Sequence, residues 1–275
     1  MTAVEVLAAG PLTTFQDLGR PGFGHLGVPP AGAVDPCALV RGNRLLGNAP
    51  GATALEATLV GPRLRFRAEA LVALTGAEVA SGADPVRRLG AGEVLDVGPC
   101  RVGARVYVCV RGGFVVEPVL GSSSTDLLTG LGPAPLRDGD VLAIGPPPAD
   151  PPAEQPPRPR APAGGAFRLL LGPRDERLTP AAVETLFTSR WRVTAAANRV
   201  GIRLDGPVLE LSRHDELLSE GLVTGALQVP PSGRPILLLN DHPTTGGYPA
   251  VGVVDSRDLP RAGQLRPGDT MTFAR

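Results

Sequence analysis

The stretch VGARVYVCV, residues 102–110, decides the fold class of this chain. It is rich in valine and bounded by glycine and proline, which is typical of a buried β-strand. Helix signals are few: Asp35-Pro36 and Thr179-Pro180 are the two pairs that can open a helix. We therefore predict a mainly β fold with a few short helices. Further strand-like runs lie at residues 4–8, 71–75, 141–144, 167–171, 193–196, 236–239, 251–254 and 271–273.

Composition excludes several classes of protein. The chain has 275 residues, 43% of them apolar, 36 glycines and 31 prolines, and its formal net charge is zero. A neutral chain with scattered arginines has no basic stripe for phosphates, so nucleic acid is not an expected partner. The start MTAVEVLAAG lacks the features of a signal peptide, and no run of about 18 apolar residues occurs. We expect a cytoplasmic protein with no membrane partner.

All 27 basic side chains other than histidine are arginines, because the sequence contains no lysine. The chain therefore has no Schiff-base nucleophile, no P-loop lysine for nucleotide phosphates and no side chain to carry biotin. An ATP site or a biotin arm is expected on another protein, and this chain alone is expected to bind no cofactor. The three cysteines match neither a disulfide framework nor a zinc site, so no metal is predicted. Cys37 follows a helix-opening pair that can lower its pKa, but an inert thiol is preferred.

Proline divides the chain into two parts. We predict an N-terminal β subdomain (residues 1–146), a proline-rich linker (147–165) and a C-terminal β subdomain (166–275). Short similar motifs occur in both halves of the chain. VPPAG at 28–32 matches VPPSG at 229–233, GPRLRF matches GPVLEL, and LRDGD matches LRPGD. They favour two related barrel-like subdomains that are able to exchange segments, with a cleft between them. Chance matches in a Gly/Pro-rich chain are the alternative.

The strongest local signal is NDHPTTGGYP, residues 240–249, which follows an apolar strand. Asp241 and His242 offer an acid/base pair, and glycine backbone can donate N–H groups to an oxyanion. A tight polar turn that satisfies its own backbone is the alternative. We predict that the loop holds the catalytic residues and part of the substrate site. The catalytic candidates are Asp241, His242, Thr244 and Thr245, and the substrate-binding candidates are Gly246, Gly247 and Tyr248.

A second cluster is TTFQDLGRPGFGHLG, residues 13–27, whose glycines exclude a regular helix. The planar guanidinium of Arg20 can bind a carboxylate through two hydrogen bonds, and Asp17 can position Arg20. An Arg20–Asp17 pair that merely holds the loop together is equally compatible with the sequence. Gln16 and His25 are further substrate-binding candidates.

A third cluster is GSSSTD, residues 121–126. Its hydroxyl and backbone groups can bind an anion, which makes Ser123 a substrate-binding candidate. A serine run more often caps the next turn or helix. No G-x-S-x-G elbow accompanies it, so a serine hydrolase has little support.

Together these clusters resemble the family of the 5-oxoprolinase C subunit, also known as the allophanate-hydrolase subunit 2, KipA-like or biotin-dependent carboxyltransferase family. The resemblance runs nearly from end to end. Two departures are the GSSST stretch, which lacks an arginine that the family often has, and the proline-rich linker. The matching motifs are residues 13–35, 43–48, 55–62, 74–77, 121–126, 198–206, 219–249 and 265–269.

The resemblance implies two cyclophilin-like β-barrel subdomains. It also implies an ATP-dependent amidohydrolase made of several subunits, in which the A and KipI-like B subunits of 5-oxoprolinase help to open 5-oxo-L-proline to L-glutamate. In that scheme the loops around Arg20 and His242 converge on a cleft that binds a small amide or lactam. Arg20 holds its carboxylate, Asp241 or His242 moves protons, and residues 244–247 stabilise charge on oxygen. A non-catalytic KipA-like regulator and a carboxyltransferase that uses carboxybiotin supplied in trans are the alternatives.

Overall fold

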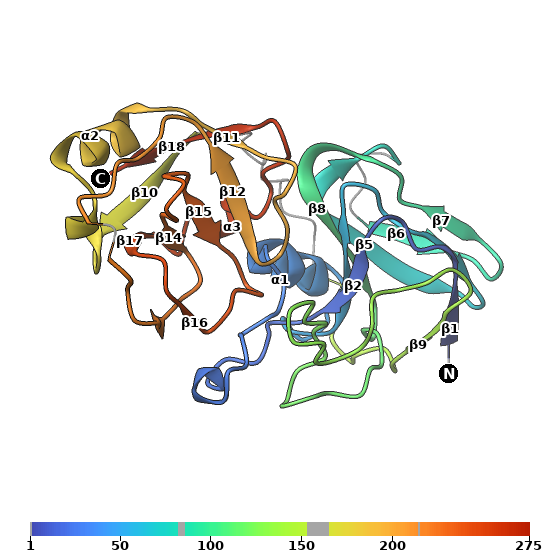
Figure 1. Cartoon of the computed structure of the whole chain (residues 1–275). Coiled ribbons are helices and arrows are strands. Elements are labelled where there is room, and N and C mark those ends of the chain that lie inside the picture. The colour runs from blue at the N-terminus through green and yellow to red at the C-terminus, as the bar shows by residue number, and fades with distance from the viewer. Residues whose placement is uncertain (1, 82–85, 153–164, 214) are drawn as a thin grey trace. The chain divides into compact units, whose positions relative to one another are not determined.

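The computed structural model describes residues 2–81, 86–152, 165–213 and 215–275 (Figure 1). Its described part divides into two compact units. The first contains Met1–Arg20, Ala31–Asp126 and Gly130–Ala161, and the second contains Pro162–Arg275 together with two segments from earlier in the chain. Those two segments are Pro21–Pro30 and Leu127–Thr129. Residues 153–164 of the predicted linker lie outside the described residues, so the predicted linker and domain boundaries stay predictions.

The first unit contains two antiparallel sheets. The run at 102–110 is confirmed as part of β8, which pairs with β3 and β5 at the centre of a five-stranded sheet. The other sheet has the order β7-β4-β1-β9. The strands of the larger sheet are β2 (Thr13–Gln16), β3 (Ala54–Thr58), β5 (Ala70–Val79), β6 (Val86–Leu89) and β8 (Cys100–Val110). Those of the smaller sheet are β1 (Thr2–Ala8), β4 (Arg63–Phe66), β7 (Val94–Asp96) and β9 (Val141–Ile144).

The helix predicted after Asp35 is confirmed as α1 (Pro36–Leu45). The Asp35 carboxylate accepts a hydrogen bond from the backbone N–H of Ala38 at 3.0 Å, which satisfies one of the free donors at the helix start. The helix packs against β5 and β8 (Figure 1). Leu39, Tyr107 and Cys109 are fully buried in that contact, so α1 covers one face of the five-stranded sheet.

The second unit is a closed seven-stranded barrel (Figure 1). The parallel pairing of β10 with β18, which sets Phe167 opposite Phe273, is the closing contact. The barrel strands are β10 (Gly165–Leu171), β17 (Ala250–Val254), β14 (Ala226–Gln228), β15 (Ile236–Leu238), β12 (Gly201–Asp205), β11 (Trp191–Val193) and β18 (Thr270–Ala274). The remaining elements of this unit are β13 (Glu220–Gly221), β16 (Thr245–Gly246), α2 (Pro180–Thr188), α3 (Leu259–Ala262) and the 3₁₀ turns η1 (Gly24–Leu26) and η2 (Asp175–Arg177).

The mainly β fold with few short helices is thus confirmed, and the second predicted helix is α2, capped by the Thr179 hydroxyl. Two strands are shorter than predicted. The strand expected at 236–239 ends at Leu238. The strand expected at 193–196 ends at Val193, because the N–H of Ala197 donates to the carbonyl of Thr194 and turns the chain. In the described part of the chain, no helix is long and apolar enough to cross a membrane.

Candidate functional site

The carboxylate of Asp17 organises the serine stretch in the first unit. It accepts hydrogen bonds from the hydroxyls of Ser122 and Ser124, both at 2.6 Å, and from the backbone N–H of Ser123 at 2.7 Å. The backbone N–H of Gly19 donates to it at 2.7 Å. Four donors on one carboxylate fix two loops that lie more than one hundred residues apart in the sequence. The serine loop is therefore held by Asp17 in addition to hydrogen bonds of its own turn, such as that from the N–H of Ser124 to the Ser122 hydroxyl.

Arg20 is 1% exposed, and its guanidinium contacts the backbone of the serine loop. Its Nε donates to the carbonyl of Val119 at 3.2 Å and its Nη2 donates to the carbonyl of Ser124. These two atoms hold backbone carbonyls of the serine loop, and the predicted role of Arg20 in binding a substrate carboxylate stays a prediction. The Asp17 carboxylate accepts from the serine loop, so the described hydrogen bonds do not include an Arg20–Asp17 pair.

Three buried polar atoms near this loop have no hydrogen-bond partner among the described residues: Arg20 Nη1, Gln16 Oε1 and Thr125 Oγ1. Gln16 is fully buried, and its Nε2 donates to the carbonyl of Thr125 at 3.0 Å. Arg20 Nη1 can donate a hydrogen bond, Gln16 Oε1 can accept one and Thr125 Oγ1 can do both. The substrate-binding roles of Gln16 and Arg20 stay predictions.

In the second unit, Asp241 forms a buried ion pair with Arg199. The Nε and Nη2 atoms of Arg199 donate to the two carboxylate oxygens, each at 2.9 Å, and the exposed fractions are 0% for Asp241 and 1% for Arg199. The backbone N–H of Leu127 approaches the same carboxylate at 3.4 Å. Because both carboxylate oxygens accept hydrogen bonds from Arg199, the pair fixes the start of the loop that follows Asp241. The catalytic role predicted for Asp241 stays a prediction.

His242 is the group of this loop that can move a proton. Its Nδ1 lies 2.7 Å from the carbonyl oxygen of Pro243, so Nδ1 carries the hydrogen and Nε2 is left as the acceptor of the neutral ring. Burial lowers the pKa of His242, against the smaller raising effects of the Pro243 carbonyl and the Asp241 charge. His242 is 3% exposed, and a neutral imidazole whose Nε2 carries no hydrogen is the form that a general base requires.

The rest of the loop follows the barrel surface. Thr245 and Gly246 form β16, in which Gly246 pairs with Glu220 of β13, while Gly247 and Tyr248 are exposed. Thr244 is half-buried, and its carbonyl accepts from the N–H of Leu222 at 2.9 Å. Pairing with β13 engages part of the backbone that was predicted to stabilise an oxyanion.

His25 and Cys37 take no part in either cluster. His25 is exposed in η1, where its Nδ1 lies 3.1 Å from the carbonyl of Gly22. Burial and the neighbouring Asp35 charge raise the pKa of Cys37, so the expectation of a pKa lowered by the helix start is wrong and the preferred inert thiol stands. Within the described residues, no three His, Cys, Asp or Glu side chains gather to hold a metal.

Comparison with known proteins identifies the family of this chain. The family model described as carboxyltransferase domain, subdomain A and B, matches residues 26–275. The chain belongs to this family. It is 37% identical to the C subunit of 5-oxoprolinase from Escherichia coli, over 98% of this chain and 90% of that protein. It is 31% identical to the urea amidolyase of Lachancea kluyveri, but spans only 17% of it. The crystal structure of K. lactis urea amidolyase superposes with a TM-score of 0.92 at 32% identity, covering 98% of this chain and 18% of that one.

Within this carboxyltransferase domain the predicted residues fall into two groups. Those around the serine loop, which are Gln16, Asp17, Arg20 and Ser123, lie in the first unit. The second unit holds the other eight predicted residues: His25, Asp241, His242, Thr244, Thr245, Gly246, Gly247 and Tyr248. Convergence of the two groups on one cleft concerns the relative placement of the units and stays a prediction.

Sequence reasoning missed Arg199 as the partner of Asp241. Arg199 was visible only inside the motif NRVGIRLDG, residues 198–206, among many arginines. The Asn198 side chain accepts from the N–H groups of Val200 and Gly201, which shapes the turn from which Arg199 enters the interior. An arginine directly after the asparagine of an Asx turn, and shortly before a buried strand, was the available signal.

Replacing Asp17 by asparagine is expected to lower the free energy of unfolding by about 2 kcal/mol, because charge-assisted hydrogen bonds to two hydroxyls and an N–H are weakened. Urea denaturation followed by circular dichroism measures this change. The matched control is Asp96→Asn, since the Asp96 side chain is 60% exposed in an ion pair with Arg63. Equal midpoints for the two variants would show that Asp17 does not hold the serine loop.

The buried state of His242 predicts a dependence of stability on pH. Because burial lowers its pKa, the folded protein binds fewer protons at this ring than the unfolded chain does. The stabilisation is complete above the unfolded pKa of about 6.5 and is lost as the pH falls below that value. Urea denaturation at about pH 7.5 and pH 5.5 should show a smaller loss for His242→Gln than for the wild type. An identical loss in both proteins would contradict the assignment.

Proposed function

We propose that this chain is the C subunit of an ATP-dependent 5-oxoprolinase, which opens 5-oxo-L-proline to L-glutamate together with the A and B subunits. The observation that carries the proposal is the similarity to the C subunit of E. coli 5-oxoprolinase, because 37% identity extends over 98% of this chain and 90% of that one. The identity to the urea amidolyase of Lachancea kluyveri is lower, at 31%, and this chain spans 17% of that protein.

The chemistry requires an activated carbonyl, since a lactam is a poor electrophile for water. Phosphoryl transfer from ATP, bound by a partner protein, supplies that activation. This chain offers no lysine for a phosphate site, which is consistent with ATP binding elsewhere. Its own contribution is at His242, whose Nε2 accepts the proton of the attacking water. The Arg199–Asp241 pair fixes the start of the loop that carries this imidazole.

Carboxyl transfer is the second candidate, favoured by the match to the carboxyltransferase domain model and by the fold shared with K. lactis urea amidolyase. Without lysine the chain cannot carry biotin itself, so carboxybiotin would have to come from a partner. His242 would then accept a proton from the amide nitrogen that is carboxylated.

Reconstitution tests the proposal. The chain is combined with its cognate A and B subunits, and glutamate formed from 5-oxo-L-proline and ATP is measured while each of the three proteins is left out in turn. Glutamate formation that requires all three supports the proposed function. Failure of the complete mixture contradicts it. A stable complex of this chain with the B subunit without turnover would then favour the KipA-like regulator, and activity only with a biotin carrier would favour carboxyl transfer.

A further inference from the structure

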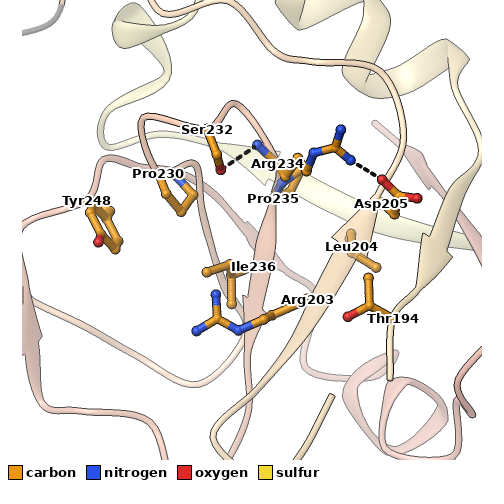
Figure 2. Close-up of a pocket in the computed structure, with 10 residues that line it drawn as sticks. All are labelled: Thr194, Arg203, Leu204, Asp205, Pro230, Ser232, Arg234, Pro235, Ile236 and Tyr248. Atoms are coloured by element: carbon orange, nitrogen blue, oxygen red, sulfur yellow. Dashed lines mark hydrogen bonds and ion pairs between the residues drawn. The ribbon is translucent and has the colours of Figure 1, made fainter. Parts of the chain in front are cut away.

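A pocket of about 320 Å³ opens on the barrel of the second unit (Figure 2). It is formed mainly by β12 and β15, by the turn between β14 and β15, and by Tyr248 from the end of the His242 loop. Its volume is near the lower end of small-molecule sites, which begin at about 300 Å³. The lining residues are Thr194, Arg203, Leu204, Asp205, Pro230, Ser232, Arg234, Pro235, Ile236 and Tyr248.

The pocket carries an excess of positive charge. The carboxylate of Asp205 is already engaged, by Arg192 at 2.9 Å and by Arg234. The exposed guanidinium of Arg203 has no acceptor among the described residues. Figure 2 shows the Arg203 side chain extending past Ile236 toward the side of the pocket where Tyr248 lies. A planar guanidinium that lines a pocket and has hydrogen-bond donors to spare is suited to binding a carboxylate.

A second polar atom lacks a partner at the same place. The Thr194 Oγ1 atom is buried without a hydrogen-bond partner in the described part of the chain, and the Thr194 N–H donates to the Arg203 carbonyl at 3.0 Å. The walls beside these groups are flat and apolar, formed by Pro230, Ile236 and the ring of Tyr248, whose residue is 48% exposed. An exposed tyrosine face can stack on a planar group such as an amide.

We propose that this pocket binds the small lactam carboxylate substrate, with Arg203 holding the carboxylate and Tyr248 packing against the planar lactam. The inference rests on the proposed function, because the substrate class comes from it. It moves the carboxylate-binding role from Arg20, whose guanidinium holds backbone carbonyls, to an arginine of the barrel. It also places the substrate beside the loop that carries His242, since Tyr248 belongs to both.

Isothermal titration calorimetry of the full chain tests this assignment. The wild type is titrated with 5-oxo-L-proline and with 2-pyrrolidinone, which has the same lactam but no carboxylate. We expect Arg203→Gln to weaken binding of 5-oxo-L-proline roughly 10- to 100-fold, as for loss of a charged hydrogen-bonding partner, and to leave 2-pyrrolidinone binding unchanged. The matched control is Arg257→Gln, because Arg257 is an exposed arginine that pairs with Asp255 outside the pocket.

Thr194→Val separates binding from folding. Removing an unpaired hydroxyl should leave the urea midpoint unchanged or raised, yet weaken 5-oxo-L-proline binding if the ligand uses Thr194 Oγ1. No measurable binding by the wild-type chain, or equal affinities for wild type and Arg203→Gln, would overturn the inference.

The two proposals fail in different ways. If the reconstituted complex produces glutamate and Arg203→Gln leaves both affinity and KM unchanged, the pocket assignment is wrong and the proposed function stands. If the chain binds 5-oxo-L-proline through Arg203 but no mixture of the three proteins produces glutamate, the proposed function is wrong and the binding site stands.

Discussion

Replacing His242 by alanine is expected to lower kcat of the reconstituted complex roughly 100- to 10,000-fold, the range lost when a general base is removed. The reason is that burial favours the neutral ring, and Nδ1 donates to the Pro243 carbonyl, which leaves Nε2 without a hydrogen. KM for 5-oxo-L-proline should change little, because the proposed role of His242 is to accept a proton from the attacking water and not to hold the carboxylate or the lactam. Steady-state rates of glutamate formation measure both quantities.

Two further measurements make this expectation specific to proton transfer. The wild-type rate should fall at acidic pH as the imidazole protonates, and the residual rate of His242→Ala should lose that limb of the profile. His242→Gln keeps a polar side chain of similar size but no base, so it should be as slow as the alanine variant. Retention of wild-type turnover by His242→Gln would exclude this base from the mechanism.

Replacing Asp241 by asparagine is expected to destabilise the second unit by about 3–5 kcal/mol, because a buried guanidinium loses its counter-charge. Arg199 is 1% exposed, so water cannot replace the lost carboxylate without rearrangement of the interior. Denaturant titration followed by the fluorescence of Trp191 measures this loss directly, since that tryptophan is buried within the barrel. The Arg199→Met variant should be destabilised by a similar amount.

The double variant Arg199→Met/Asp241→Leu distinguishes an unpaired charge from a lost contact. Two apolar residues of similar volume should restore much of the stability, because neither leaves a charge buried alone. Arg257, whose side chain is 76% exposed in its ion pair with Asp255, is the control, and Arg257→Gln should change the denaturation midpoint far less than Asp241→Asn does. If the double variant is as unstable as the sum of its parts, the pair does not act as a unit.

Much of the fold was accessible from the sequence because its signals are local. The valine-rich run of β8 and the cap–proline pairs that start α1 and α2 each act within a few residues. Barrel closure was not accessible in the same way. The parallel pairing of β10 with β18 joins residues about a hundred positions apart, and nothing in either strand specifies the other.

The candidate site shows the same limit more sharply. Arg20 and Asp17 are neighbours in sequence, which suggested that they pair, yet each turns to a different group of the serine loop. Asp241 and His242 are adjacent, but one is fixed by a distant arginine while the other keeps an available nitrogen. Local sequence identified the loops, whereas the roles of individual side chains depend on partners that only the folded chain supplies.

The membership of Pro21–Pro30 and Leu127–Thr129 in the second unit has a consequence for biosynthesis. Pro21–Pro30 leaves the ribosome long before β18, which ends at Ala274. This segment can therefore join the complete second unit only after nearly the whole chain has been synthesised. Completion of the second unit is therefore a late event built on contacts between distant residues, and such contacts form slowly. A C-terminal fragment that begins at the proline-rich stretch would lack Pro21–Pro30 and Leu127–Thr129, both of which belong to the second unit.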